Sequence, residues 1–84
     1  MASGATIEVL YFGRIAELTS RHSETLPWLA TDTGRDLLDR LRARHPALAQ
    51  SAKLKLAINQ AHAPADTAIS AGDEVAVFEP VTGG

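Results

Sequence analysis

The sequence predicts a single α+β domain in which a mixed β-sheet packs on one main helix. Two β-rich segments near the start, Thr6–Phe12 and Ser23–Trp28, precede one amphipathic helical segment that begins near Thr33. Further β-rich segments follow this helix. Because a helix separates the first and last strands in the chain, these two strands can lie side by side and parallel. The expected order of the main elements is therefore β-β-α-β-β, in a twisted mixed sheet.

Length and composition indicate a small domain with one core. Its 84 residues are near the lower size at which one core suffices, and the absence of cysteine excludes disulfides and thiolate sites. Eight basic and ten acidic side chains, without a basic cluster, argue against nucleic acid and membrane surfaces as main partners. No signal peptide or membrane-spanning segment is recognisable. We therefore expect a cytoplasmic location.

The first β-rich segment, Thr6–Phe12, alternates between two faces. One face carries three residues that suit a core: Ile7, Val9 and Tyr11. The other face carries a glutamate and two apolar residues: Glu8, Leu10 and Phe12. Because a glutamate is unsuited to a core, we expect the second face to look toward water, with Leu10 and Phe12 on an open surface. Gly13 then breaks the strand, and Ile15–Thr19 is expected to form a short helical turn.

The main helix carries clear start and stop signals. Thr33 is the expected N-cap, and Asp36 takes the place of the glutamate in a capping box. The helix should end near His45, because Pro46 follows. Three leucines form one apolar stripe, listed here: Leu37, Leu38 and Leu41. Four charged residues are expected to face outward: Arg35, Asp39, Arg42 and Arg44.

Two strands are expected after the helix, at Leu54–Ile58 and Glu74–Glu79. In the first of them, the inward residues are Leu54, Leu56 and Ile58, and the outward residues are Lys53, Lys55 and Ala57. Asn59–Pro64 contains turn formers, and Ala68–Ile69 is predicted to be a brief edge strand. In the last strand, Phe78 lies on the same face as Glu74, so it should join Phe12 on the open surface.

The sequence ends in a short segment with uncharged side chains, Pro80-Val81-Thr82-Gly83-Gly84. Pro80 has no N–H to donate to a sheet, so the last strand must stop before it. The four residues that follow can span roughly 13 Å at about 3.3 Å each. Glycines lack a Cβ and can therefore pass through a narrow channel. We divide the chain into a domain of residues 1–79 and a flexible tail of residues 80–84.

Apart from the tail, no group of residues could catalyse a reaction alone. The three histidines, His22, His45 and His62, lack the spacing of metal ligands, so we expect no metal site. The sequence also contains no phosphate-binding loop and no nucleophile motif. The distinctive chemical group is the terminal carboxylate of Gly84.

Several segments together resemble a known family. The most specific is the turn and strand Gly72–Phe78 leading into the tail; weaker ones are Val9–Phe12, Ala16–Leu18 and Leu56–Gln60. These segments resemble the small subunit of molybdopterin synthase, a ubiquitin-like sulfur carrier. The resemblance is thin from His22 to Ser51. The sequence departs from the family pattern at three positions. Val77 stands where the family tends to have an aromatic residue, Glu79 where a proline is usual, and His62 where an apolar partner-facing residue is common.

The resemblance implies the β-grasp fold and a mechanism centred on Gly84. An E1-like adenylyltransferase would use ATP to adenylate the carboxylate, and a sulfur donor would convert it to a thiocarboxylate. The sulfur would then attack cyclic pyranopterin monophosphate in molybdenum cofactor biosynthesis. The chain itself would bind no cofactor, and Gly84 would be its one catalytic group.

The same resemblance implies the large subunit of the synthase as partner, in a heterotetramer of two small and two large subunits. The residues expected to contact it are three from the open face and four from the tail: Leu10, Phe12, Phe78, Pro80, Val81, Thr82 and Gly83. The catalytic acids and bases would belong to the large subunit.

Three alternatives remain open. Another β-grasp sulfur carrier, of a thiazole-type pathway, would share the fold and the Gly-Gly end. A ubiquitin-like protein modifier would instead be joined through Gly84 to lysines of its targets. In the third alternative the chain is an interaction domain and the tail is inert, a frayed end or the remnant of a linker.

Overall fold

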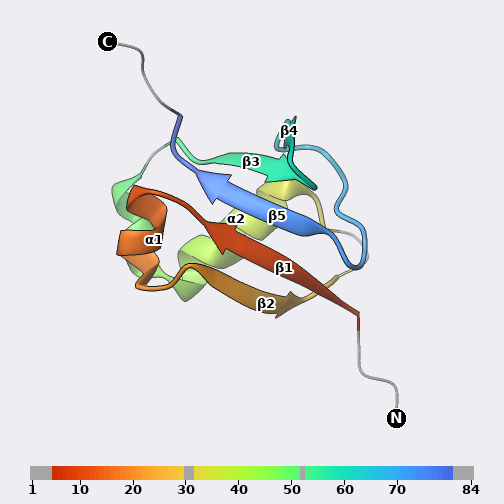
Figure 1. The fold of residues 1–84 in the computed structure, drawn as a ribbon, viewed down its shortest axis with the longest axis horizontal. Helices are drawn as coiled ribbons and strands as arrows, with labels where there is room; N and C mark the ends of the chain where they lie inside the picture. The colour runs from red at the N-terminus through yellow and green to blue at the C-terminus, as the bar shows by residue number, and fades with distance from the viewer. Residues whose placement is uncertain (1–4, 30–31, 52, 81–84) are drawn as a thin grey trace.

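The computed structural model describes residues 5–29, 32–51 and 53–80. Within these ranges the chain forms eight elements (Figure 1): β1 (Thr6–Tyr11), α1 (Arg14–Thr19), β2 (Ser23–Pro27), α2 (Gly34–Arg44), the 3-10 helix η1 (Pro46–Gln50), β3 (Lys55–Ile58), β4 (Ala61–Ala63) and β5 (Glu74–Phe78). The strands form one sheet in the order β2-β1-β5-β3-β4. The first and last strands lie side by side and parallel, as predicted, and all other neighbouring pairs are antiparallel.

The core lies between the sheet and α2, which crosses behind the sheet in Figure 1. The predicted inward residues of β1 are at most 2% exposed, and the three leucines of α2 are also buried. Ile15 of α1 and Leu48 of η1 are fully buried and complete the same core. Alternation along the strands and the helical stripe therefore assigned the buried faces correctly.

The start of α2 has the predicted capping box. The backbone N–H of Asp36 donates to Thr33 Oγ1 at 3.3 Å, and Asp36 Oδ2 accepts from the backbone N–H of Thr33 at 3.0 Å. Both bonds satisfy N–H groups that the first turn of a helix leaves unpaired. The helix ends at Arg44, with His45 as C-cap and Pro46 next, also as predicted.

The predicted edge strand at Ala68–Ile69 is wrong. The strand at this edge of the sheet is β4, which pairs with β3 through a tight hairpin, and β2 forms the other edge. Asn59 and Gln60 both have positive φ values, 50° and 71°, as the two central residues of a type I′ hairpin turn require. The turn therefore spans two residues, which leaves Ala61–Ala63 free to pair. Ala68 makes only an isolated bridge with Thr33.

Two further details differ from the sequence analysis. Ala57 lies on the open face, as predicted, but it is buried at 9% exposure. Its cross-strand neighbours are Ala76 and His62, and they cover its small side chain. The helical turns of η1 were not predicted. No helix in the part of the chain that the structure describes is long and apolar enough to cross a membrane.

Candidate docking surface and tail attachment

The sheet face that points away from α2 carries three of the predicted contact residues. Leu10 of β1 lies beside Ala76 of β5, and the backbone N–H of Phe12 donates to the carbonyl oxygen of Val77 at 3.2 Å. These pairings bring Phe12 and Phe78 to the same end of the two central strands. Phe12 is 52% exposed, and Leu10 and Phe78 are half-buried. The structure thus places all three on one surface; their role as partner contacts stays a prediction.

The tail is attached at this same end of the sheet (Figure 1). Pro80, the fourth contact residue within the described ranges, directly follows the end of β5 and is half-buried. It lines a groove of about 560 Å³ together with Phe78. The other predicted tail residues, Val81 to Gly84, lie outside the described residues. The chain therefore leaves the domain next to an exposed aromatic surface.

Glu79, the residue before Pro80, is held against α1. Arg14 Nη1 donates to Glu79 Oε2 at 3.1 Å. Both side chains are partly exposed, so this ion pair contributes only about 0–1 kcal/mol to stability. The ion pair links the residue before Pro80 to the first residue of α1. Glu79, where the family usually has a proline, is thus paired with Arg14, a residue near the other end of the chain.

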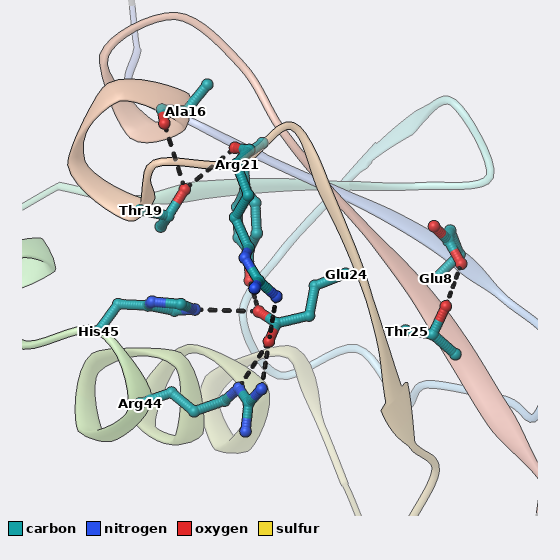
Figure 2. Close-up of polar contacts among 9 residues, drawn as sticks. Glu8, Ala16, Thr19, Arg21, Glu24, Thr25, Arg44 and His45 are labelled. Carbon is teal, nitrogen blue, oxygen red and sulfur yellow. Dashed lines mark hydrogen bonds and ion pairs between the residues drawn. The ribbon is translucent and has the colours of Figure 1, made fainter.

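A buried carboxylate that the sequence analysis missed lies on the opposite face of the sheet (Figure 2). Glu24 of β2 points toward α2, and its side chain is 3% exposed. The hydroxyl of Tyr11 donates to Glu24 Oε1 at 2.7 Å, and Arg44 Nε donates to Oε2 at 2.9 Å. Arg21 Nη1 and His45 Nε2 each lie 2.9 Å from one of the two carboxylate oxygens. We call these five residues the Glu24 cluster.

The Glu24 cluster shifts the pKa of its members. Burial raises the pKa of Glu24, but hydrogen bonds from Arg44, His45 and Tyr11 together outweigh it and lower that pKa from 4.5 to about 2. Burial, and then the bond to Glu24, raise the pKa of Tyr11, so its hydroxyl remains a donor. The cluster therefore joins β1, β2 and the end of α2. The sequence does contain a signal for this cluster, because Glu24 and the core residue Leu26 are two positions apart in β2 and therefore share one face of the strand.

The sequence analysis expected no metal site at the histidines, and the described residues allow a check of their surroundings. Within them, no group of three histidine, aspartate or glutamate side chains could hold a metal ion. His45 belongs to the Glu24 cluster, and the ring of His62 meets that of Phe78 edge-on at 5.3 Å between centroids. Both histidines therefore have partners within the domain.

Known proteins share both the sequence and the fold. A family model described as the ThiS family matches residues 9–84. The chain belongs to the ThiS family. A curated relative from Mycobacterium tuberculosis, named molybdopterin synthase sulfur carrier subunit, is 36% identical over 81 residues, which cover 93% of this chain and 96% of the relative. A human relative of the same name is 33% identical and covers 93% of both chains.

A solved structure supports the same assignment for this ThiS-family chain. Small archaeal modifier protein 1 from Haloferax volcanii is 30% identical, with a TM-score of 0.81, over 93% of this chain and all of that chain. The fold is therefore the ubiquitin-like β-grasp, as predicted. The resemblance to the small subunit of molybdopterin synthase is likewise confirmed by the curated relatives of that name.

Proposed function

We propose that this chain is the sulfur-carrier subunit of molybdopterin synthase and acts in molybdenum cofactor biosynthesis in the cytoplasm. The observation that carries the proposal is the match to molybdopterin synthase sulfur carrier subunits over 93% of the chain. The position of the tail supports this proposal, because the chain leaves the domain at Pro80, beside the exposed aromatic surface. A sulfur carrier needs a reactive end and a surface that docks on its partner enzyme.

The reactive group is the carboxylate of Gly84. A carboxylate is a poor electrophile, so it must first be activated by an E1-like adenylyltransferase. A carboxylate oxygen attacks the α-phosphorus of ATP, pyrophosphate leaves, and an acyl-adenylate forms. A donor of sulfur at the sulfide level then attacks the acyl carbon; the new C–S bond forms as the bond to AMP breaks, AMP leaves, and a thiocarboxylate remains. The chain binds no cofactor of its own in this scheme.

The folded domain presents the thiocarboxylate to the large subunit. Leu10, Phe12 and Phe78 dock on that subunit, and the two phenylalanines act as aromatic anchors of the interface. The tail residues Val81, Thr82 and Gly83 extend from Pro80 into the active site, where the sulfur attacks cyclic pyranopterin monophosphate. The large subunit supplies the general acids and bases. Two small and two large subunits form the complete synthase.

Intact-mass measurement tests this chemistry directly. Incubation with the adenylyltransferase, ATP and a sulfur donor should increase the mass of the chain by the difference between sulfur and oxygen. Omission of ATP should prevent the change. The M. tuberculosis relative, treated in parallel, is the positive control. If the relative gains the sulfur and this chain does not, the proposal is wrong.

Replacement of Phe78 by alanine should weaken binding to the large subunit by roughly 2 kcal/mol or more, about 30-fold in Kd. The side chain is half-buried on the open face, so its truncation removes contact area from the partner surface rather than from the core. Calorimetric titration with the large subunit measures the change.

The matched control for Phe78→Ala is Leu29→Ala. Leu29 is 46% exposed and follows β2, whose neighbour in the sheet is β1 and not β5. This variant should bind the large subunit with nearly unchanged affinity. If Phe78→Ala instead unfolds the free domain, Phe78 belongs to the core and the docking surface has been assigned to the wrong face.

A second candidate function is protein modification, because the H. volcanii neighbour is named a modifier protein. After the same adenylation, the ε-amine of a target lysine would attack the acyl carbon of Gly84, and AMP would leave as an isopeptide bond forms. Mass spectrometry of cells that express the tagged chain distinguishes the two functions. Adducts that require Gly84, together with unchanged cofactor synthesis on deletion of the gene, would favour the modifier.

A further inference from the structure

The groove beside the tail attachment is lined by both apolar and charged residues. It has a volume of about 560 Å³, and its apolar lining includes Phe78, Pro64 and Pro80. Lys55, His62 and Glu79 provide the polar groups of its lining. Lys55 is the cross-strand neighbour of Phe78 in the antiparallel pair of β3 and β5. Its side chain therefore stands beside the Phe78 ring on the open face of the sheet.

Among the described residues, the unpaired charge of this groove is positive, although the chain as a whole carries a formal charge of −2. Among the described residues that line the groove, Glu79 supplies the one carboxylate, and Arg14, which is not part of this lining, is bound to it at 3.1 Å. Lys55 has no ion-pair partner within residues 5–29, 32–51 and 53–80. A ligand that enters the groove therefore meets a lysine whose charge is not balanced by the described residues.

We propose that this groove receives an apolar segment of the large subunit that carries a carboxylate, and that Lys55 pairs with this carboxylate. The inference rests on the proposed function and names the chemistry of the partner surface. Pro80 lines the groove and directly precedes the tail. A protein that takes residues 81–84 into its active site must consequently approach the groove closely. The groove is thus continuous with the proposed docking surface.

The contribution of Lys55 should depend on salt. A charge at the edge of an interface affects association mainly through long-range attraction, which dissolved salt screens. Lys55→Glu should weaken binding to the large subunit about 10-fold at roughly 50 mM salt and less than about 3-fold at roughly 500 mM. Lys55→Met, which removes the charge but keeps an unbranched apolar side chain, should have an intermediate effect.

Lys53→Glu is the matched control. Lys53 is the only other lysine of the sequence; it is exposed and does not line the groove. Lys53→Glu changes the net charge by the same amount as Lys55→Glu. It should alter the Kd for the large subunit by less than about 2-fold, because surface substitutions usually have small effects. Melting temperatures of all variants, measured without partner, establish that the domain remains folded.

Three results would overturn the groove proposal. Equal weakening by Lys53→Glu and Lys55→Glu would indicate a general electrostatic effect. Unchanged large-subunit binding by Lys55→Glu at both salt concentrations would exclude the ion pair. A loss confined to adenylation would assign Lys55 to the activating enzyme instead. Intact mass of the wild-type protein separates this proposal from the proposed function. If the wild type gains the sulfur, the proposed function stands whatever the Lys55 variants show. If it does not, the function itself is contradicted.

Discussion

Deletion of Gly84 is expected to abolish sulfur transfer and to leave the fold intact. The carboxylate would then lie on Gly83, displaced by about 3.3 Å along an extended chain. A misplacement of about 1 Å can already reduce a rate about 100-fold, so a shift of this size should remove measurable activity. The core residues that the structure describes end at Val77, and the Tm should therefore change little.

Two assays locate the defect of the Gly84 deletion. Single-turnover transfer to cyclic pyranopterin monophosphate measures the reaction in the large subunit, and intact mass measures thiocarboxylation by the activating enzyme. A variant with one extra glycine after Gly84 is a useful control, because it moves the carboxylate in the opposite direction and should also be inactive. Retention of synthase activity in the shortened chain would exclude Gly84 as the sulfur-bearing residue.

Glu24→Gln is expected to destabilise the domain by up to about 3 kcal/mol at neutral pH. The lowering of the Glu24 pKa from 4.5 to about 2 corresponds to about this free energy. Arg21 and Arg44 are about half exposed and can return to water, which reduces the loss. The buried hydroxyl of Tyr11 would meanwhile lose its carboxylate acceptor. Denaturant unfolding at constant pH measures the change.

The pH dependence distinguishes the charge of Glu24 from its packing. Because its pKa is lower in the folded state, the contribution of Glu24 is fully present above the unfolded pKa of 4.5. It is lost as the pH falls from 4.5 toward 2. The free energy of unfolding of the wild type should decrease over this window, and that of Glu24→Gln should decrease less. Parallel decreases in the two proteins would show that the ion pairs of Glu24 do not stabilise the fold.

Glu8→Gln is the matched control for this comparison. Glu8 lies on the neighbouring strand β1, on the open face, and its carboxylate accepts a hydrogen bond from the hydroxyl of Thr25. The same carboxylate-to-amide change there should alter the free energy of unfolding by only about 0.5 kcal/mol. The comparison isolates the effect of burying Glu24 among cationic partners.

Local patterns predicted much of this structure. Alternation in β1 separated its buried residues from Leu10 and Phe12, and the spacing of Thr33 and Asp36 predicted the capping box. The prediction failed where several local patterns were compatible with the same residues. Asn59–Pro64 has the composition of a loop, but two left-handed residues form the turn and the remainder pairs as β4.

The sequence by itself determined the fold class, the faces of the main strands and the bounds of α2. Each depends on residues close together in the chain, whose preferences are expressed locally. Tertiary structure decided the Glu24 cluster, the pair of Arg14 with Glu79 and the groove that contains Lys55. Tyr11 is 13 residues from Glu24, and Arg14 is 65 residues from Glu79. Such contacts arise only when β1, β2, α2 and β5 have packed together, because packing sets the distance and the burial that give these charges their partners.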